Sequence, residues 1–264
     1  MLFLLSFFFL SLGSFASVLI YRLPIIDTKN SDIGLFLPRS HCPNCKKTIR
    51  LINLIPLIGY FKQSGKCERC NSVIGISYFI HEITHLSFGL SLYVFLGISS
   101  LSILVYLLFF IFYILLISDL NNFFLPYYLN LSISFIGLLL AFLGTPFHIE
   151  TYGFIESSQI FISIYGFICG YGVLFFINFI YQIVNKVDGI GGGDFLLLGG
   201  IGTLVGPLSL STIILLGSLL TLVIRYVNYD KYKQELPLGA GIIIGLFTYT
   251  ICKFFELSLF GLVI

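Results

Sequence analysis

Charged residues are scarce in this chain. Only 10% of its 264 residues are Asp, Glu, Lys or Arg, whereas 58% are hydrophobic, and it has 29 Phe but no Trp. The mean hydropathy is +1.03. So little charge excludes an ordinary water-soluble enzyme and predicts a polytopic membrane protein, which has the lipid bilayer as a partner. The net charge of +2 gives no reason to expect a nucleic-acid partner.

Basic residues are absent before the first apolar run, which covers residues 1–21. A secretory signal peptide would carry a positive charge there. The run is about long enough to cross a bilayer once, and Arg22 follows it directly. We therefore predict an uncleaved first span with its N-terminus outside and its basic flank in the cytoplasm.

Seven further spans are predicted from hydropathy and from the Pro and Gly residues between the apolar runs. They are expected at residues 76–97, 100–118, 125–144, 158–184, 195–206, 208–224 and 237–256.

Basic residues then fall on one side of the predicted membrane. The inward loops are residues 22–75, 119–125, 185–194 and 225–236. They carry every Lys and Arg except Lys253. The outward loop 145–157 has none. This distribution satisfies the positive-inside rule.

The inward segment 22–75 contains two Cys-x-x-Cys pairs, Cys42 with Cys45 and Cys67 with Cys70. Four thiolates at this spacing can bind one zinc ion, and four protein ligands predict a structural site. Two disulfides are the alternative, but they would need an oxidising compartment, which the basic charge of the loop argues against. The expected fold class is an all-α polytopic membrane protein with about eight transmembrane helices and a small cytoplasmic zinc-binding loop domain. The other two cysteines lie in apolar runs and are predicted to be packing residues: Cys169 and Cys252.

A glycine-rich stretch at 189–200 places Asp194 at the mouth of an apolar segment. The predicted topology brings Asp119 to the same cytoplasmic side. Two aspartates held close together in a low-dielectric site share one proton, so one can act as base and the other as acid in aspartic proteolysis. The alternative is that each only caps a helix at the membrane interface.

These aspartates and several other motifs together resemble the type IV prepilin peptidases, a family of membrane aspartic proteases that cleave leaders from prepilins and type II secretion pseudopilins. The resemblance extends over most of the chain. The matching stretches are 13–24, 38–45, 55–57, Tyr78 with Glu82, Asp119-Leu120 with Leu125-Pro126, 193–195 and 237–239.

The resemblance implies that Asp119 and Asp194 are catalytic and that the four cysteines bind zinc. It also implies a second activity, methylation of the new N-terminal residue with S-adenosylmethionine. The implied location is the bacterial cytoplasmic (inner) membrane, with the active site facing the cytoplasm and prepilins or pseudopilins as substrates. The domains would be the span 1–21, the zinc-binding region 22–75, and the bundle 76–264 with its protease core at about 100–224. No cofactor-binding residue for the methyl donor is indicated.

Two positions depart from the family pattern. Leu196 stands where the family usually has Lys, two positions after the second aspartate, and Asn121-Asn122 stand where an acidic residue and His are frequent. The missing lysine removes a cation that could lower an aspartate pKa. We expect the departure to affect rate, pH optimum and substrate range rather than the aspartate pair itself.

An alternative interpretation of the function rests on His81, Glu82 and His85, which form a His-Glu-x-x-His motif. On a helix the two histidines share a face and can bind zinc beside a glutamate base, with Asp188 as a third ligand. That alternative is an intramembrane zinc metalloprotease of the site-2 type. A third alternative is a membrane transporter, although the sequence lacks an obvious inverted repeat.

The remaining glycines are given two different roles. Those at 191–193 are expected to let an extended peptide reach Asp194 without meeting a Cβ. Gly200, Gly239 and Gly241 are interpreted as sites of close helix packing, with no chemistry assigned.

Overall fold

The computed structural model describes residues 1–27, 34–143, 159–232 and 235–254, and these ranges are mostly helical. They contain no named strand, only two isolated β-bridges. The chain divides into two compact units, Met1–Phe110 and Ile111–Ile264. The predicted outward loop 145–157 lies outside the described residues.

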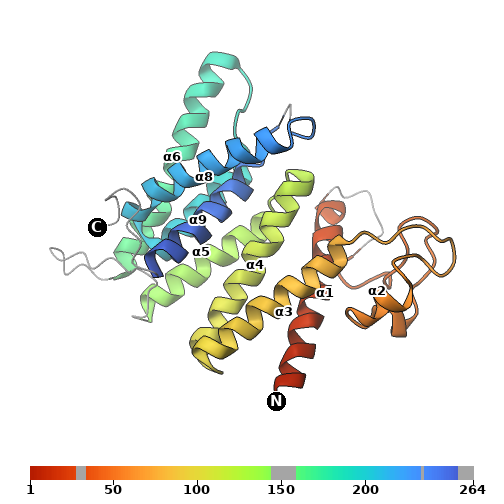
Figure 1. The fold of residues 1–264 in the computed structure, drawn as a ribbon. Coiled ribbons are helices and arrows are strands. Elements are labelled where there is room, and N and C mark those ends of the chain that lie inside the picture. Colours follow the sequence, from red (N-terminus) through yellow and green to blue (C-terminus); the bar gives the residue numbers. More distant parts are fainter. Residues whose placement is uncertain (28–33, 144–158, 233–234, 255–264) are drawn as a thin grey trace. The chain divides into compact units, whose positions relative to one another are not determined.

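The first unit is built on helices α1 (Leu2–Asp27) and α3 (Ser77–Leu96), which pack against each other (Figure 1). Gly13 permits this contact, because a Cβ there would lie 2.7 Å from the backbone Cα of Glu82. Aromatic rings fill the space toward the start of α4 (Ser100–Asn122), and Phe88 stacks on Phe109 with centroids 3.7 Å apart.

Between α1 and α3 runs the cysteine-containing segment. It holds a short 3-10 helix, η1 (Leu51–Leu54), and helix α2 (Ile58–Lys62). Three prolines, Pro38, Pro43 and Pro56, interrupt the segment after α1 and oppose a long helix there, whereas Pro24 lies within α1.

The second unit contains the end of α4 and five more helices. These are α5 (Tyr127–Phe142), α6 (Gln159–Asn185), α7 (Gly192–Val205), α8 (Pro207–Val227) and α9 (Leu238–Phe254). α7 packs against both α5 and α6, and α8 packs along α9 (Figure 1). Gly202 and Gly166 allow the backbones of α7 and α6 to approach closely, because a Cβ on either residue would run into the carbonyl group of the other.

The helical prediction is confirmed, because each expected span appears as a helix. The first span was predicted to end too early: α1 continues past residue 21 to Asp27 and includes Arg22 and Pro24. Among the described residues, five helices are long and apolar enough to cross a membrane: α1, α3, α4, α6 and α8. The shorter apolar helices are α5, α7 and α9. The chain is therefore an all-α, multi-pass membrane protein.

Candidate active site

Asp119 lies near the C-terminal end of α4 and is only 4% exposed. Its Oδ2 accepts a hydrogen bond of 2.7 Å from the backbone N–H of Ala240. Ala240 belongs to the first turn of α9, where backbone N–H groups have no acceptor within their own helix and favour a negative charge. The start of α9 therefore fixes and stabilises this carboxylate.

Asp194 lies in the first turn of α7, and its N–H donates to the carbonyl of Gly191 at 3.0 Å. Its Oδ1 is buried and accepts no hydrogen bond of normal geometry from any described group. An acceptor enclosed in this way is available to a water molecule or a substrate proton.

Gly239 shows how close the two carboxylates are. A Cβ built on it would lie 3.1 Å from Oδ1 of Asp194 and 3.2 Å from Oδ2 of Asp119. The two oxygens are therefore no further apart than the sum of these distances. The structure brings together the two aspartates that the sequence singled out, from α4 and α7, at the start of α9.

The role expected for Gly239 was incomplete. Close packing is part of it, since the added Cβ would also lie 2.6 Å from Cδ1 of Leu125. Gly239 in addition keeps the space between the two carboxylates free of a side chain. The Pro-Leu-Gly motif at 237–239 was the available sequence signal. Gly241, by contrast, is a packing residue as expected, because a Cβ there would meet the side chain of Thr221 and lie 2.6 Å from the Gly217 carbonyl oxygen.

Two asparagines that the sequence analysis did not identify hold the glycine-rich segment. Asn178 of α6 accepts from the N–H groups of Gly189 and Ile190 at 2.8 and 3.0 Å. Asn130 of α5 is fully buried and donates to the Gly193 carbonyl at 3.1 Å. These bonds hold the segment in place just before and at the start of α7. A lone Asn within an apolar run was the only sequence signal for either residue.

The glycines at 191–193 differ in their surroundings. A Cβ on Gly193 would lie 2.8 Å from Cβ of Leu125, so this position is already closed by the protein's own packing. A Cβ on Gly192 would meet nothing within 4 Å. Gly192 therefore lies next to open space, and Gly193 does not. The expectation that Gly193 serves substrate approach thus has a competing structural explanation.

The segment after α8 is attached to the end of α4. Lys231 Nζ and the Tyr232 hydroxyl both donate to the carbonyl oxygen of Leu120, at 2.8 and 2.9 Å. Leu120 directly follows Asp119. Lys231 therefore places a positive charge at the C-terminal end of α4, where it is favourable to the helix dipole.

The four sequence-predicted cysteines form a second cluster, in the first unit. The sulfur atoms of Cys42, Cys45, Cys67 and Cys70 all lie within 4.8 Å of one another and are not joined as disulfides. This arrangement can hold a metal ion, and four thiolates are typical zinc ligands.

The two cysteine pairs sit in turns of the same construction. The N–H of Cys42 bonds to the Lys47 carbonyl at 3.0 Å, and the N–H of Cys67 bonds to the Ser72 carbonyl at 2.9 Å. Lys46 and Asn71 have positive φ angles of 57° and 55° at equivalent points. The local sequence thus builds two copies of one turn, each of which presents two sulfurs to the same point.

Hydrogen bonds lower the pKa of two of the four thiols. A hydrogen bond from the backbone of Cys45 is the main cause that lowers the pKa of the Cys42 thiol to about 6. The Ser72 hydroxyl lies 3.1 Å from the Cys70 sulfur and lowers the pKa of that thiol as well. Both effects favour thiolates, the form that binds metal.

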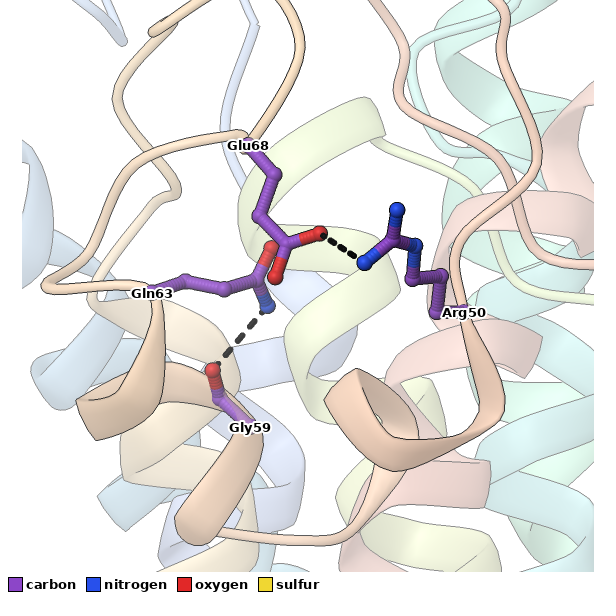
Figure 2. A network of polar contacts seen from close by, with 4 residues as sticks. All are labelled: Arg50, Gly59, Gln63 and Glu68. Atoms are coloured by element: carbon purple, nitrogen blue, oxygen red, sulfur yellow. Dashed lines mark hydrogen bonds and ion pairs between the residues drawn. The ribbon is translucent and has the colours of Figure 1, made fainter.

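A polar network lies beside the turns (Figure 2). Glu68, between the second pair of cysteines, forms an ion pair of 3.8 Å with Arg50, which follows the first pair. Gln63 at the end of α2 donates to the Gly59 carbonyl at 3.0 Å. Arg50 is well exposed, so its ion pair adds little stability. We therefore attribute the stability of this region to the four-cysteine cluster.

Within the described residues, the alternative metalloprotease motif is not placed to hold a metal ion. Across the described ranges, the four cysteines are the only group placed to hold a metal ion. Glu82 accepts the Leu57 N–H at 2.7 Å, and His85 Nδ1 lies 3.0 Å from the Tyr106 hydroxyl. Asp188, the suggested third ligand, accepts a bond from Asn178. These residues serve helix packing and the cysteine segment.

Comparison with known families identifies both units. The bacterial Peptidase A24 N-terminal domain matches residues 7–96, and the Type IV leader peptidase family matches residues 104–225. These matches favour neither the metalloprotease nor the transporter alternative. No solved structure matches the chain.

Curated relatives match over nearly their whole length. A prepilin leader peptidase/N-methyltransferase of Vibrio cholerae is 30% identical over 92% of this chain and 94% of its own. A type 4 prepilin-like proteins leader peptide-processing enzyme of Escherichia coli is 29% identical, with 89% and 88% covered. A prepilin leader peptidase/N-methyltransferase of Neisseria gonorrhoeae is 28% identical, with 89% and 85% covered. On this evidence the chain belongs to the type IV leader peptidase family.

Proposed function

We propose that this protein is a membrane aspartic endopeptidase that removes the leader from type IV prepilins or type II secretion pseudopilins, with Asp119 and Asp194 as its catalytic pair. One observation carries the proposal. The two carboxylates converge on one residue, Gly239, at the start of α9. The names of the relatives give the substrate class.

The chemistry follows from two carboxyl groups in one low-dielectric site. They cannot both ionise easily, so one holds a proton while the other is charged. The charged carboxylate takes a proton from a water that attacks the scissile carbonyl, and the protonated carboxyl gives its proton to the leaving amine. The Ala240 N–H favours the ionised form of Asp119. We therefore assign the base to Asp119 and the acid to Asp194.

The site faces the cytoplasm of the bacterial inner membrane in this proposal. The support is the concentration of basic residues, nine of fourteen, between Arg22 and Arg69. A prepilin would place its apolar helix in the bilayer and its short basic leader in the cytoplasm, with the bond between them at the aspartates.

The four-cysteine cluster binds one zinc ion in a structural role. Four protein ligands leave no open position for a water nucleophile. The ion holds the two cysteine turns together, and it takes no part in peptide cleavage.

The second proposed activity is methylation of the new N-terminal amine with S-adenosylmethionine. Its support is the printed name of several relatives and the match of residues 7–96 to the N-terminal family domain.

One experiment tests both activities. The full-length protein in membranes is incubated with a prepilin and S-adenosylmethionine, and the product is analysed by mass spectrometry. We expect a mature N-terminus that carries one added methyl group. An intact prepilin after incubation with correctly inserted protein would contradict the peptidase assignment.

A further inference from the structure

A cavity of about 230 Å³ lies within the first unit, between α1, the two cysteine turns and α3. A single water molecule needs only about 10–15 Å³ on a comparable measure, so the cavity has room for a small organic molecule. Every residue that lines it belongs to the first unit, whereas both aspartates belong to the second. The peptidase chemistry gives it no role.

The cavity wall contributed by α3 carries a buried carboxylate. Glu82 is 8% exposed, accepts the Leu57 N–H at 2.7 Å and is also hydrogen-bonded by the Ser14 hydroxyl. No described Lys or Arg pairs with it, and the ion pair recorded in this part of the chain joins Arg50 and Glu68. A buried carboxylate that lacks a cation is costly. The cavity therefore favours an occupant that brings a positive charge.

Four aromatic side chains contribute to the wall. Tyr21 of α1, Tyr60 of α2, and Tyr78 and Phe79 of α3 line the cavity. Aromatic faces stack on flat heterocycles and attract cations.

Arg22 also lines the cavity, but its guanidinium is already used by the protein. It donates to the backbone carbonyls of Gly34, Leu35 and Pro38, at 2.6 to 3.0 Å, and so holds the chain at the cavity rim. The lining thus provides a carboxylate and rings rather than a cluster of free cations, which disfavours a phosphate ligand.

We infer that this cavity binds S-adenosylmethionine. The inference rests on the proposed methyltransferase activity and adds the location and binding residues of its donor. This donor carries a sulfonium and an ammonium cation beside an adenine ring, and it supplies a transferable methyl group. The wall fits these groups: Glu82 meets the positive charge, and the tyrosine rings meet the adenine.

The test is direct binding to the full-length protein in lipid nanodiscs, measured by calorimetry with S-adenosylmethionine. Glu82→Gln keeps the size of the side chain and removes its charge, so we expect at least about tenfold weaker binding. Val18→Phe adds bulk to a cavity-lining position of α1 and should weaken binding without any change of charge. The matched control is Asp27→Asn, at the exposed end of α1, which should bind the donor as the wild type does.

Photo-crosslinking with radiolabelled donor supplies the location. We expect the label on peptides from residues 14–82. Normal donor affinity in both Glu82→Gln and Val18→Phe, or a label outside these residues, overturns the inference. If either result is obtained while the wild type still methylates its product, only the assignment of the donor to this cavity is wrong, and the methyltransferase proposal stands. If the wild type neither binds the donor nor methylates, the methyltransferase proposal fails too, while cleavage remains testable separately.

Discussion

The two units assemble their chemical groups in opposite ways. In the first unit, four sulfurs come from two short turns, and each turn is fixed by hydrogen bonds between residues at most five positions apart. In the second, the two carboxylates come from α4 and α7, 75 positions apart, and a third helix, α9, completes the site. Local sequence therefore encodes the metal cluster, whereas helix packing encodes the aspartate pair. Mutations at the metal cluster and at the aspartate pair should therefore have different effects on folding and on cleavage.

The largest effect is expected from the aspartates. Asp119→Asn or Asp194→Asn should lower cleavage by about 10²- to 10⁴-fold, because a carboxamide can hold hydrogen bonds but cannot exchange the proton. Prepilin processing followed by mass spectrometry measures the loss. Asp188→Asn is the control, since this exposed carboxylate beside the glycine segment bonds only Asn178 among the described groups. More than a few per cent of activity in either mutant would remove that aspartate from the pair.

Gly239→Ala should come next, with a loss of cleavage of about tenfold or more. The new methyl group would enter the space between the carboxylates, while the nearby Leu125 side chain can move aside. Thermal unfolding in detergent should change little. Gly241→Ala offers the contrast, because its Cβ meets the Gly217 carbonyl and should lower stability instead. A Gly239→Ala enzyme with normal kcat/KM would show that the space between the aspartates is not needed.

Removal of the metal should affect the first unit most. We expect about one zinc per chain, lost in Cys42→Ser, with faster proteolysis of residues 34–75 because the two turns lose their shared centre. Cleavage should fall only a few-fold, since the aspartates lie in the other unit. Cys169→Ser, at an exposed position of α6, is the control. Metal analysis that finds no zinc in the wild type, or disulfides among these cysteines, would contradict the assignment.

The smallest effect should come from Gly192→Val, with kcat/KM lowered a few-fold. This position adjoins open space near Asp194, so a side chain there can obstruct an extended peptide without disturbing the fold. Gly193→Val cannot make this test, because its side chain would clash with Leu125. Gly172→Val on α6, also next to open space, is the matched control. Equal rates for the two variants and the wild type would contradict the prediction that an extended peptide passes close to Gly192 on its way to Asp194.

The sequence by itself determined the membrane class, the helical segments and the four cysteines. Apolar runs of about 20 residues can satisfy their backbone in lipid only as helices, and a Cys-x-x-Cys turn is a local structure. It also singled out Asp119 and Asp194, since carboxylates at the ends of apolar helices are costly. Their catalytic role remains a prediction.

Tertiary structure alone decided what surrounds those residues. Three contacts between helices distant in sequence show this. The N–H of Ala240 donates to Asp119, Gly239 lies between the two carboxylates, and Asn130 donates to the carbonyl of Gly193. The same holds for the cavity around Glu82, whose walls come from α1, the cysteine turns and α3. Hydropathy and spacing describe each helix separately. They do not say which faces meet, because that depends on the packing of small residues between helices.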